Sequence, residues 1–132
     1  MGIQDFLDGH AECAIWLAYD ADDSGELKSY DWGSGAADGA VRDCLPWLTD
    51  SARMDLDRDA REFYRDHLNM LHDTGADMGQ LGHDFWLSRE GHGTGFWDRG
   101  YPNGDELHRG AQAYGSGPML YVDDGSERIS MS

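Results

Sequence analysis

The 132-residue chain has room for one domain with a modest core, and its 39% apolar content, with five Trp, six Tyr and four Phe, is sufficient for folding. Its 10 Lys and Arg stand against 26 Asp and Glu, so the formal net charge is −16. This charge excludes direct binding to nucleic acid, because neutralising phosphates takes clustered Lys and Arg, and it favours basic partners instead.

Two helices are predicted in the first half of the chain. Residues 3–19 place apolar side chains at steps typical of one helical face, although Gly9 weakens the helix near its start. Residues 20–40 are rich in Asp, Gly and Ser and are predicted to be an acidic loop. Apolar residues recur every three or four positions between about residue 50 and residue 72, which predicts a second helix with Asp50 or Ser51 as its N-cap.

The second half favours strands. DFWLS at 84–88 and TGFW at 94–97 are predicted to be two strands joined by the Gly-rich turn REGHG. A short helix is expected over 104–114, followed by a hairpin that pairs 118–122 with 127–131 through the turn residues Asp124 and Gly125. The predicted fold is therefore a single α+β domain over 1–132, with about four antiparallel strands in two hairpins and two to three helices against one face.

The central segment GHDFWLSREGHGTGFWDRG, with ECAIW near the start and LYVDDG near the end, resembles a family of small tailed-bacteriophage proteins. Members of that family carry an ECALW-like helix, a GHDFWLTRNGHGAGFWDRG-like centre and an LYVGDDG-like end. The resemblance covers about half of the chain, and Ser88 and Glu90 replace the usual Thr and Asn. It implies a phage-type accessory protein in a host cytoplasm, and it brings no activity with it.

The acidic loop contains a pattern similar to a Ca²⁺-binding EF-hand loop. The predicted ligand positions are Asp20, Asp22, Ser24, Glu26 and Asp31. Oxygen ligands of this kind suit Ca²⁺, and Gly25 stands where the loop needs its sharp turn. Asp31 is shorter than the bidentate Glu of a typical loop, and the Gly-rich stretch after it is a poor exit helix. The simpler interpretation is a solvated Asp-rich loop.

Histidines and carboxylates around the first predicted hairpin suggest a metal site or a hydrolase centre. The candidate ligands are His83, Asp84, His92, Asp98 and His108. Imidazole and carboxylate ligands suit Zn²⁺, and a metal-dependent hydrolase would be centred on His83, His92 and Asp98. Their spacing matches no short metalloenzyme motif, so the simpler interpretation is that His92 shapes the turn and His83 bonds to backbone.

Aromatic and charged side chains of the same hairpin suggest a surface for protein binding. Alternation along DFWLS would send Trp86 and Phe85 to opposite faces, so one aromatic face is either covered by helices or free for a partner. Arg89 and Asp98 are expected to pair across the strands. The candidate interaction residues are Trp86, Arg89, His92, Trp97 and Arg99, with Asp55, Asp59 and Glu62 on the exposed side of the second helix.

The remaining features narrow the class of protein. No run of about 18 apolar residues predicts a membrane span, and the start MGIQDFLDGH lacks the segments of a secretory signal. Cys13 and Cys44 fit no disulfide or metal spacing, so free thiols in a cytoplasmic protein are expected. No nucleotide-binding or hydrolase motif occurs, and no cofactor other than Ca²⁺ is predicted.

The function predicted from these features is protein binding. The chain would bind a host or defence protein, basic or nucleic-acid-binding, with its carboxylates standing in for phosphates. Residues 20–38 and the exposed side of the second helix would supply the acidic surface. The alternatives are the Ca²⁺-binding module and the metal-dependent hydrolase. The charge is also consistent with a salt-adapted or GC-rich host, since Lys28 is the single lysine.

Overall fold

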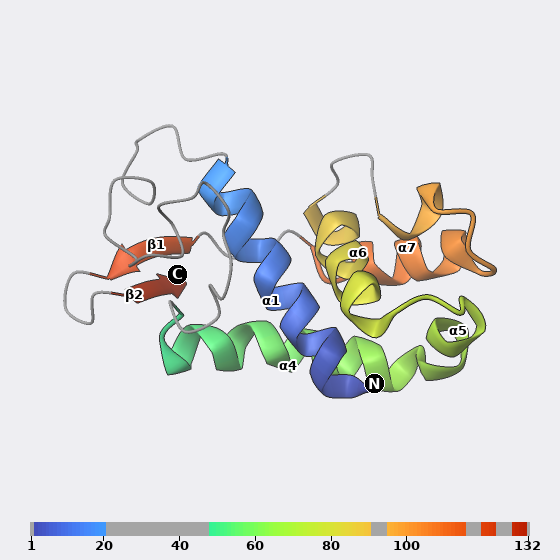
Figure 1. The fold of residues 1–132 in the computed structure, drawn as a ribbon, viewed down its shortest axis with the longest axis horizontal. Coiled ribbons are helices and arrows are strands. Elements are labelled where there is room, and N and C mark those ends of the chain that lie inside the picture. Colours follow the sequence, from blue (N-terminus) through green and yellow to red (C-terminus); the bar gives the residue numbers. More distant parts are fainter. Residues whose placement is uncertain (1, 21–47, 91–94, 116–119, 124–127, 132) are drawn as a thin grey trace.

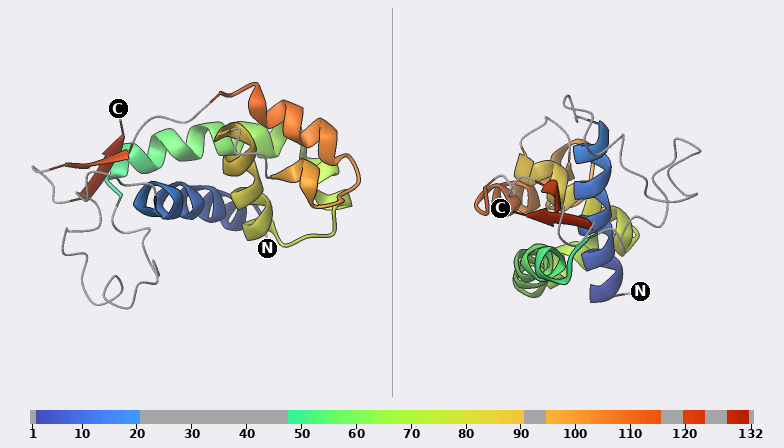
Figure 2. Two further views of the ribbon diagram at one scale, coloured as in Figure 1. Left: turned by 90° about the horizontal axis from the view of Figure 1, so that it is seen from above. Right: turned by 90° about the vertical axis from the view of Figure 1, so that its left-hand side faces the viewer.

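A computed structural model describes residues 2–20, 48–90, 95–115, 120–123 and 128–131 (Figure 1). The elements in chain order are α1 (Ile3–Asp20), α4 (Asp50–Asp66), α5 (Leu68–Asp73), α6 (Met78–Glu90), the short 3₁₀ turn η2 (Phe96–Asp98), α7 (Gly104–Gln112), β1 (Leu120–Asp123) and β2 (Arg128–Met131). Helix α1 contacts both α6 and α4, and α6 contacts α7, so these helices form the body of the described part. The β1–β2 pair lies beside the start of α4, away from α7 (Figures 1 and 2).

Helices α1 and α6 cross at a contact built from glycines. A Cβ atom on Gly82 would clash with the carbonyl oxygen of Phe6 and would lie 2.7 Å from the backbone nitrogen of His10. A Cβ on Gly9 would likewise clash with the backbone of Gly79. Gly9 is thus not a weak point of α1, because the absence of its side chain lets the two backbones approach.

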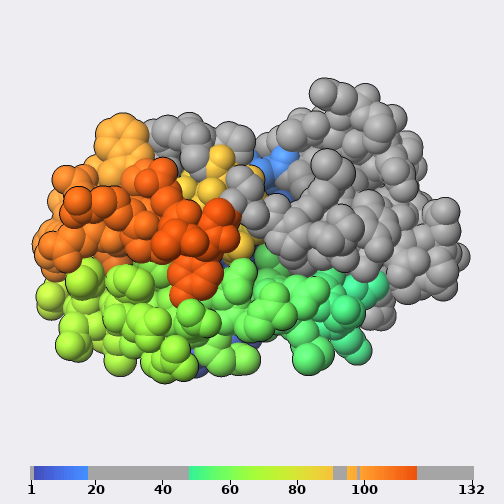
Figure 3. All heavy atoms as spheres, turned by 180° about the vertical axis from the view of Figure 1, so that it is seen from behind, coloured from blue at the N-terminus to red at the C-terminus, as the bar shows by residue number. Residues whose placement is uncertain are grey.

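The core lies where α1, α4, α6 and α7 meet. Its centre is a group of aromatic rings: Phe63 stacks on Phe85 with ring centroids 4.4 Å apart, and Phe6 and Phe96 lie 6.2 and 5.7 Å from Phe63. The smaller apolar residues that fill the space around the rings include Leu7, Ala60, Leu71, Leu81, Leu107 and Ala111. Seen from behind, α4 and α5 form one edge of the molecule and α7 covers α6, while α1 is almost hidden (Figure 3).

The predicted α+β fold is wrong, because helices build the described part. Residues 84–88 lie inside α6, and 96–98 form the turn η2, so the first predicted hairpin does not exist. The DFWLS segment alternates like a strand, but four of its five residues are buried: Asp84, Phe85, Trp86 and Ser88. A helix enclosed on several sides by other helices has no polar face to reveal its period, so the alternation was misleading.

The other predicted elements are largely confirmed. Helix α1 forms as expected, and α7 ends before Gly115, whose φ of +71° favours glycine. The second helix is divided into α4 and α5 at His67, and its N-cap is Thr49 rather than Asp50 or Ser51. The second hairpin forms a two-stranded antiparallel pair with Val122 opposite Ile129.

The acidic loop at 21–40 lies outside the described residues. Within the part that the structure does describe, no helix combines the length and the apolar character needed to cross a membrane.

Candidate functional site: an acidic groove between α1 and α6

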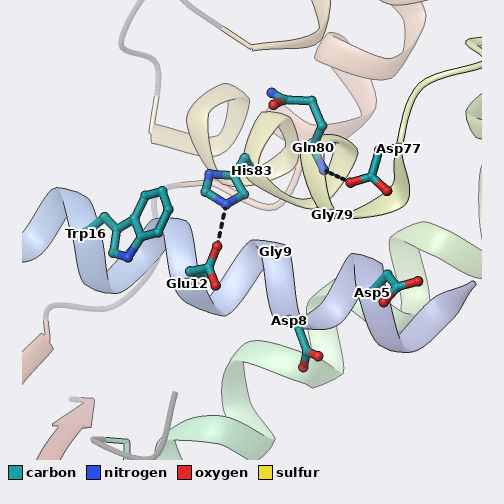
Figure 4. A pocket seen from close by; sticks show the side chains of 9 residues that line it. All are labelled: Asp5, Asp8, Gly9, Glu12, Trp16, Asp77, Gly79, Gln80 and His83. Carbon is teal, nitrogen blue, oxygen red and sulfur yellow. Dashed lines mark hydrogen bonds and ion pairs between the residues drawn. The ribbon is translucent and has the colours of Figure 1, made fainter. Parts of the chain in front are cut away.

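A groove of about 510 Å³ runs along the line where α1 and α6 meet (Figure 4). Its lining side chains and backbone come from Asp5, Asp8, Gly9, Glu12, Trp16, Asp77, Gly79, Gln80 and His83. Four of these residues are carboxylic acids and none is Lys or Arg. The glycines at the helix crossing leave the floor of the groove without side chains, so the acids stand along its sides.

One end of the groove is formed by Glu12, His83 and Trp16. The Nε2 of His83 lies 3.1 Å from Oε1 of Glu12, and the indole of Trp16 packs edge-on against the imidazole with centroids 5.0 Å apart. Figure 4 shows these three side chains converging from the two helices. Trp16 is 37% exposed, which is high for a Trp, so one aromatic face stands next to a carboxylate at the surface.

Two of the other carboxylates, Asp8 and Asp77, are held in place by hydrogen bonds. Asp8 accepts hydrogen bonds from Gln4 and from the guanidinium of Arg53 on α4. Asp77 accepts a bond of 3.3 Å from the backbone N–H of Gln80 at the start of α6, where a negative charge suits the helix dipole. Even when the positive charge of Arg53 is set against the four carboxylates, the groove keeps an excess of negative charge, which attracts cations.

A buried polar network around Arg89 joins α6 to α1, to α4 and to the chain just after α7. Arg89 of α6 is 5% exposed and donates to Oδ2 of Asp59 at 3.0 Å, to the carbonyl of Gly115 at 3.2 Å and to Nε2 of His10 at 3.1 Å. Its guanidinium also lies 5.4 Å from the ring centre of Phe85. Burial lowers the pKa of Arg89, and the charge of Asp59 opposes that shift. Arg89 lies in a helix, so the predicted cross-strand setting for a pair with Asp98 does not exist, and the side chain of Asp98 is not among the described ones.

A second buried network centres on Asp84, whose side chain is fully buried. Its carboxylate accepts hydrogen bonds from Nε of Arg99 at 3.0 Å, from the hydroxyl of Tyr101 at 2.9 Å and from the amide of Gln80 at 3.1 Å. Asp84 is thus a structural residue that holds the chain after η2 against α6. The nearby thiol of Cys13 is buried, and this burial, followed by the charges of Asp84 and Glu12, raises its pKa to about 12.

Ser88 and His108 form a pair that superficially resembles a nucleophile and its base. Nδ1 of His108 lies 3.0 Å from Oγ of Ser88. The same Oγ accepts a hydrogen bond from the backbone N–H of Phe96, and Ser88 is completely buried. Its surroundings leave no room for a substrate, and a Cβ on Gly95 would clash with that Oγ. The pair therefore fixes η2 and α7 on α6.

The structure separates the predicted interaction residues. Trp86 and Arg89 are buried, so they cannot act as surface anchors, whereas Trp97 is 46% exposed and Arg99 is also exposed. His92 lies outside the described residues.

Of the predicted residues on the second helix, Asp55 and Glu62 lie on the outer side of α4, whereas Asp59 faces α6. Asp55 pairs with Arg58, Asp59 with Arg89, and Glu62 accepts a hydrogen bond from Tyr114.

The predicted metal sites fall mostly outside the described residues. Asp20 ends α1, and the rest of the EF-hand-like loop, 21–31, is not described. Of the proposed hydrolase centre, His83 pairs with Glu12 in the groove, while His92 and the side chain of Asp98 are not described. In the part of the chain with described side chains, no three His, Cys, Asp or Glu come together as metal ligands.

Sequence reasoning missed the groove, although a signal for it exists. Asp5, Asp8, Glu12 and Trp16 follow one another at steps of three and four residues, so they share one face of α1. That face is polar and lies away from the core, so the apolar periodicity that predicts the helix does not point to it.

Comparisons of the chain with protein-family models, with curated proteins and with solved structures find no match. The function is therefore inferred from the geometry of the site.

Proposed function

We propose that this protein acts by binding a basic segment of another protein in the acidic groove between α1 and α6. The observation that carries the proposal is the placement of four carboxylates and an exposed Trp along one groove without a lining Lys or Arg. The partner is an Arg- or Lys-rich segment of a host or defence protein, such as a nucleic-acid-binding surface. Phage origin and a place in the host cytoplasm belong to the same proposal.

The groove suits a guanidinium or ammonium group for two reasons. Carboxylates such as Glu12 and Asp5 offer oxygen acceptors that form charge-assisted hydrogen bonds with such groups. The indole of Trp16 offers a ring face for a cation–π contact of about 0.5–1 kcal/mol at an exposed site. An aromatic ring next to carboxylates is a combination that recognises organic cations better than it recognises a small metal ion.

The outer side of α4, which the sequence favoured, is less suited to a basic partner. Its acidic residues alternate with Arg, and Arg58 pairs with Asp55 at 3.4 Å while Arg65 pairs with Asp66 at 3.2 Å. These arginines would repel a basic segment as strongly as the acids attract it.

Two variants with the same change in net charge test the site. In the groove variant, Asp5→Asn, Glu12→Gln and Asp77→Asn remove three charges, and Asn at 77 still accepts the hydrogen bond that caps α6. In the control variant, Asp55→Asn, Glu62→Gln and Asp66→Asn remove three charges from α4. The probe is a fluorescein-labelled Arg-rich peptide, measured by anisotropy at low and high salt.

We expect the groove variant to bind the peptide about tenfold more weakly at low salt, since three exposed charge contacts contribute about 0.5 kcal/mol each. The control variant should stay within about threefold of the wild type. Equal losses in both variants would show that only net charge matters, and they would reject the groove as the site. Pull-downs with the wild type and with the groove variant then identify the natural partner. It should be a basic protein that the wild type retains and the groove variant does not.

A further inference from the structure

The fully buried His10 of α1 has an unusual environment. Its Nε2 lies 3.1 Å from NH1 of Arg89, and a guanidinium N–H can only donate, so Nε2 must accept. His10 is therefore neutral with its hydrogen on Nδ1, and that Nδ1 is buried without a hydrogen-bond partner in the described part. Its ring packs against Phe85 and Trp86, with centroids 4.8 and 5.3 Å away.

We propose that His10 is an acid-sensitive latch between α1 and α6: uptake of one proton by Nε2 breaks the bond with Arg89 and loosens α1 from α6. The proton comes from solvent, and the lone pair that accepted the Arg89 N–H then carries the proton. Two cations would face each other across 3.1 Å in an apolar interior, which is strongly unfavourable.

The charged groups around His10 also favour its neutral form. Arg89 and His83 on α6 and Arg53 on α4 all act against a charge on His10, and the carboxylate of Asp59 is paired with Arg89. Burial, followed by the charge of Arg89, holds the pKa of His10 well below its ordinary value of 6.5.

Stability should therefore fall with acid in a defined pH window. An exposed His10 in the loosened or unfolded chain has a pKa of about 6.5, so that state binds a proton that the folded state does not bind. The stabilisation is complete above about pH 6.5 and is lost as the pH falls below it, until the pH reaches the lower pKa of the folded protein. The unfolding equilibrium constant then rises about tenfold between pH 7.5 and 5.5 for this one proton.

The latch has a consequence for the groove, which rests on the proposed function. Asp5, Glu12 and Trp16 come from α1 while Gln80 and His83 come from α6, so parting of the helices removes the groove. A basic partner bound at neutral pH would then be released once the pH falls below the pKa of His10 in the folded protein.

Urea unfolding of wild type, His10→Gln and His72→Gln at pH 7.5, 6.5 and 5.5 tests the latch. Gln at position 10 can still accept from Arg89 but does not titrate, and His72 is an exposed histidine on α5 that serves as the control. We expect wild type and His72→Gln to show the tenfold rise and His10→Gln to lose it. A wild type without pH dependence, or His10→Gln with the full rise, would overturn the proposal.

Two further measurements keep the test decisive. Imidazole NMR of the wild type should show His10 neutral, with its hydrogen on Nδ1, down to pH 5.5. If His10 instead titrates near its ordinary pKa in the folded protein, the latch is overturned. This measurement is decisive even if His10→Gln does not fold. The Arg-rich peptide should lose affinity for wild type, beyond any loss shared by His10→Gln, only below the pH at which the NMR titration shows His10 taking up its proton. Failure of the peptide to bind at pH 7.5 would reject the proposed function alone, because the unfolding result does not depend on it.

Discussion

The interface of α1 with α6 and the outer side of α4 use the same ion-pair chemistry in opposite settings. Beside that interface, where α6 meets α4, Arg89 of α6 binds Asp59 of α4 at 3.0 Å, and the side chain of Arg89 is 3% exposed. On α4, Arg58 meets Asp55 at 3.4 Å with its side chain 70% exposed. Water can take the place of either partner in the exposed Arg58–Asp55 pair, but it cannot reach the buried Arg89. Loss of a partner should therefore cost much more stability at the buried pair than on the outer side of α4. Matched substitutions in the two regions test whether their ion pairs differ in this way.

The largest difference should appear in thiol chemistry at the interface. A pKa of about 12 leaves Cys13 with about a thousandfold less thiolate near pH 8 than its ordinary value of 9.0 would. We expect iodoacetamide to modify Cys13 at least about a thousandfold more slowly in the native protein than in guanidinium chloride. Peptide mapping by mass spectrometry follows the site, and rapid native labelling of Cys13 would contradict its placement at the interface.

Removal of an arginine should have very different effects in the two regions. Arg99→Met leaves the fully buried carboxylate of Asp84 without its cation, which costs about 3 kcal/mol of stability. Arg58→Met on α4 should change stability by no more than about 0.5 kcal/mol. Urea unfolding at neutral pH measures both, and similar small losses would mean that Tyr101 and Gln80 alone satisfy Asp84.

The glycine contact gives a comparison within α6 itself. Gly82→Ala places a methyl group against the backbone of α1 and should lower stability by about 2 kcal/mol or more, despite the better helix propensity of Ala. At Gly79, the nearest atom to a new methyl group is Oδ2 of Asp77, 2.9 Å away on a side chain that can move. Gly79→Ala should therefore be close to neutral, and thermal unfolding of the pair ranks the two positions.

The smallest effect concerns the start of α4. Oγ1 of Thr49 accepts a hydrogen bond of 3.1 Å from the backbone N–H of Ala52, so Thr49→Ala should lower stability by about 1 kcal/mol. Ser51 lies two residues further along the chain and is exposed, so Ser51→Ala should hardly change the stability. A larger loss of stability in Ser51→Ala than in Thr49→Ala would instead support Ser51 as the N-cap, one of the two residues that the sequence predicted.

The sequence predicted well the elements whose signal is local. Helix α1, α7 and the β1–β2 pair were expected from apolar spacing, a terminal glycine and the Asp124–Gly125 turn. It failed at 84–97, where burial on several sides removed the polar face from α6 and left an alternation that looked like a strand. The groove was foreseeable in part, since Asp5, Asp8 and Glu12 share a face of α1, but Asp77 and His83 come to it from distant positions.

By itself, the sequence determined that this is a small acidic domain, with a strong negative charge and enough apolar residues for one core. The role of the central motif follows from tertiary contacts that the sequence did not predict. Gly82, Asp84, Ser88 and Arg89 are not residues of a surface hairpin; they are a contact point and buried hydrogen-bonding groups of α6. The reason is that helix packing depends on which backbones can approach each other and which polar groups find partners, and both are set by residues far apart in the chain.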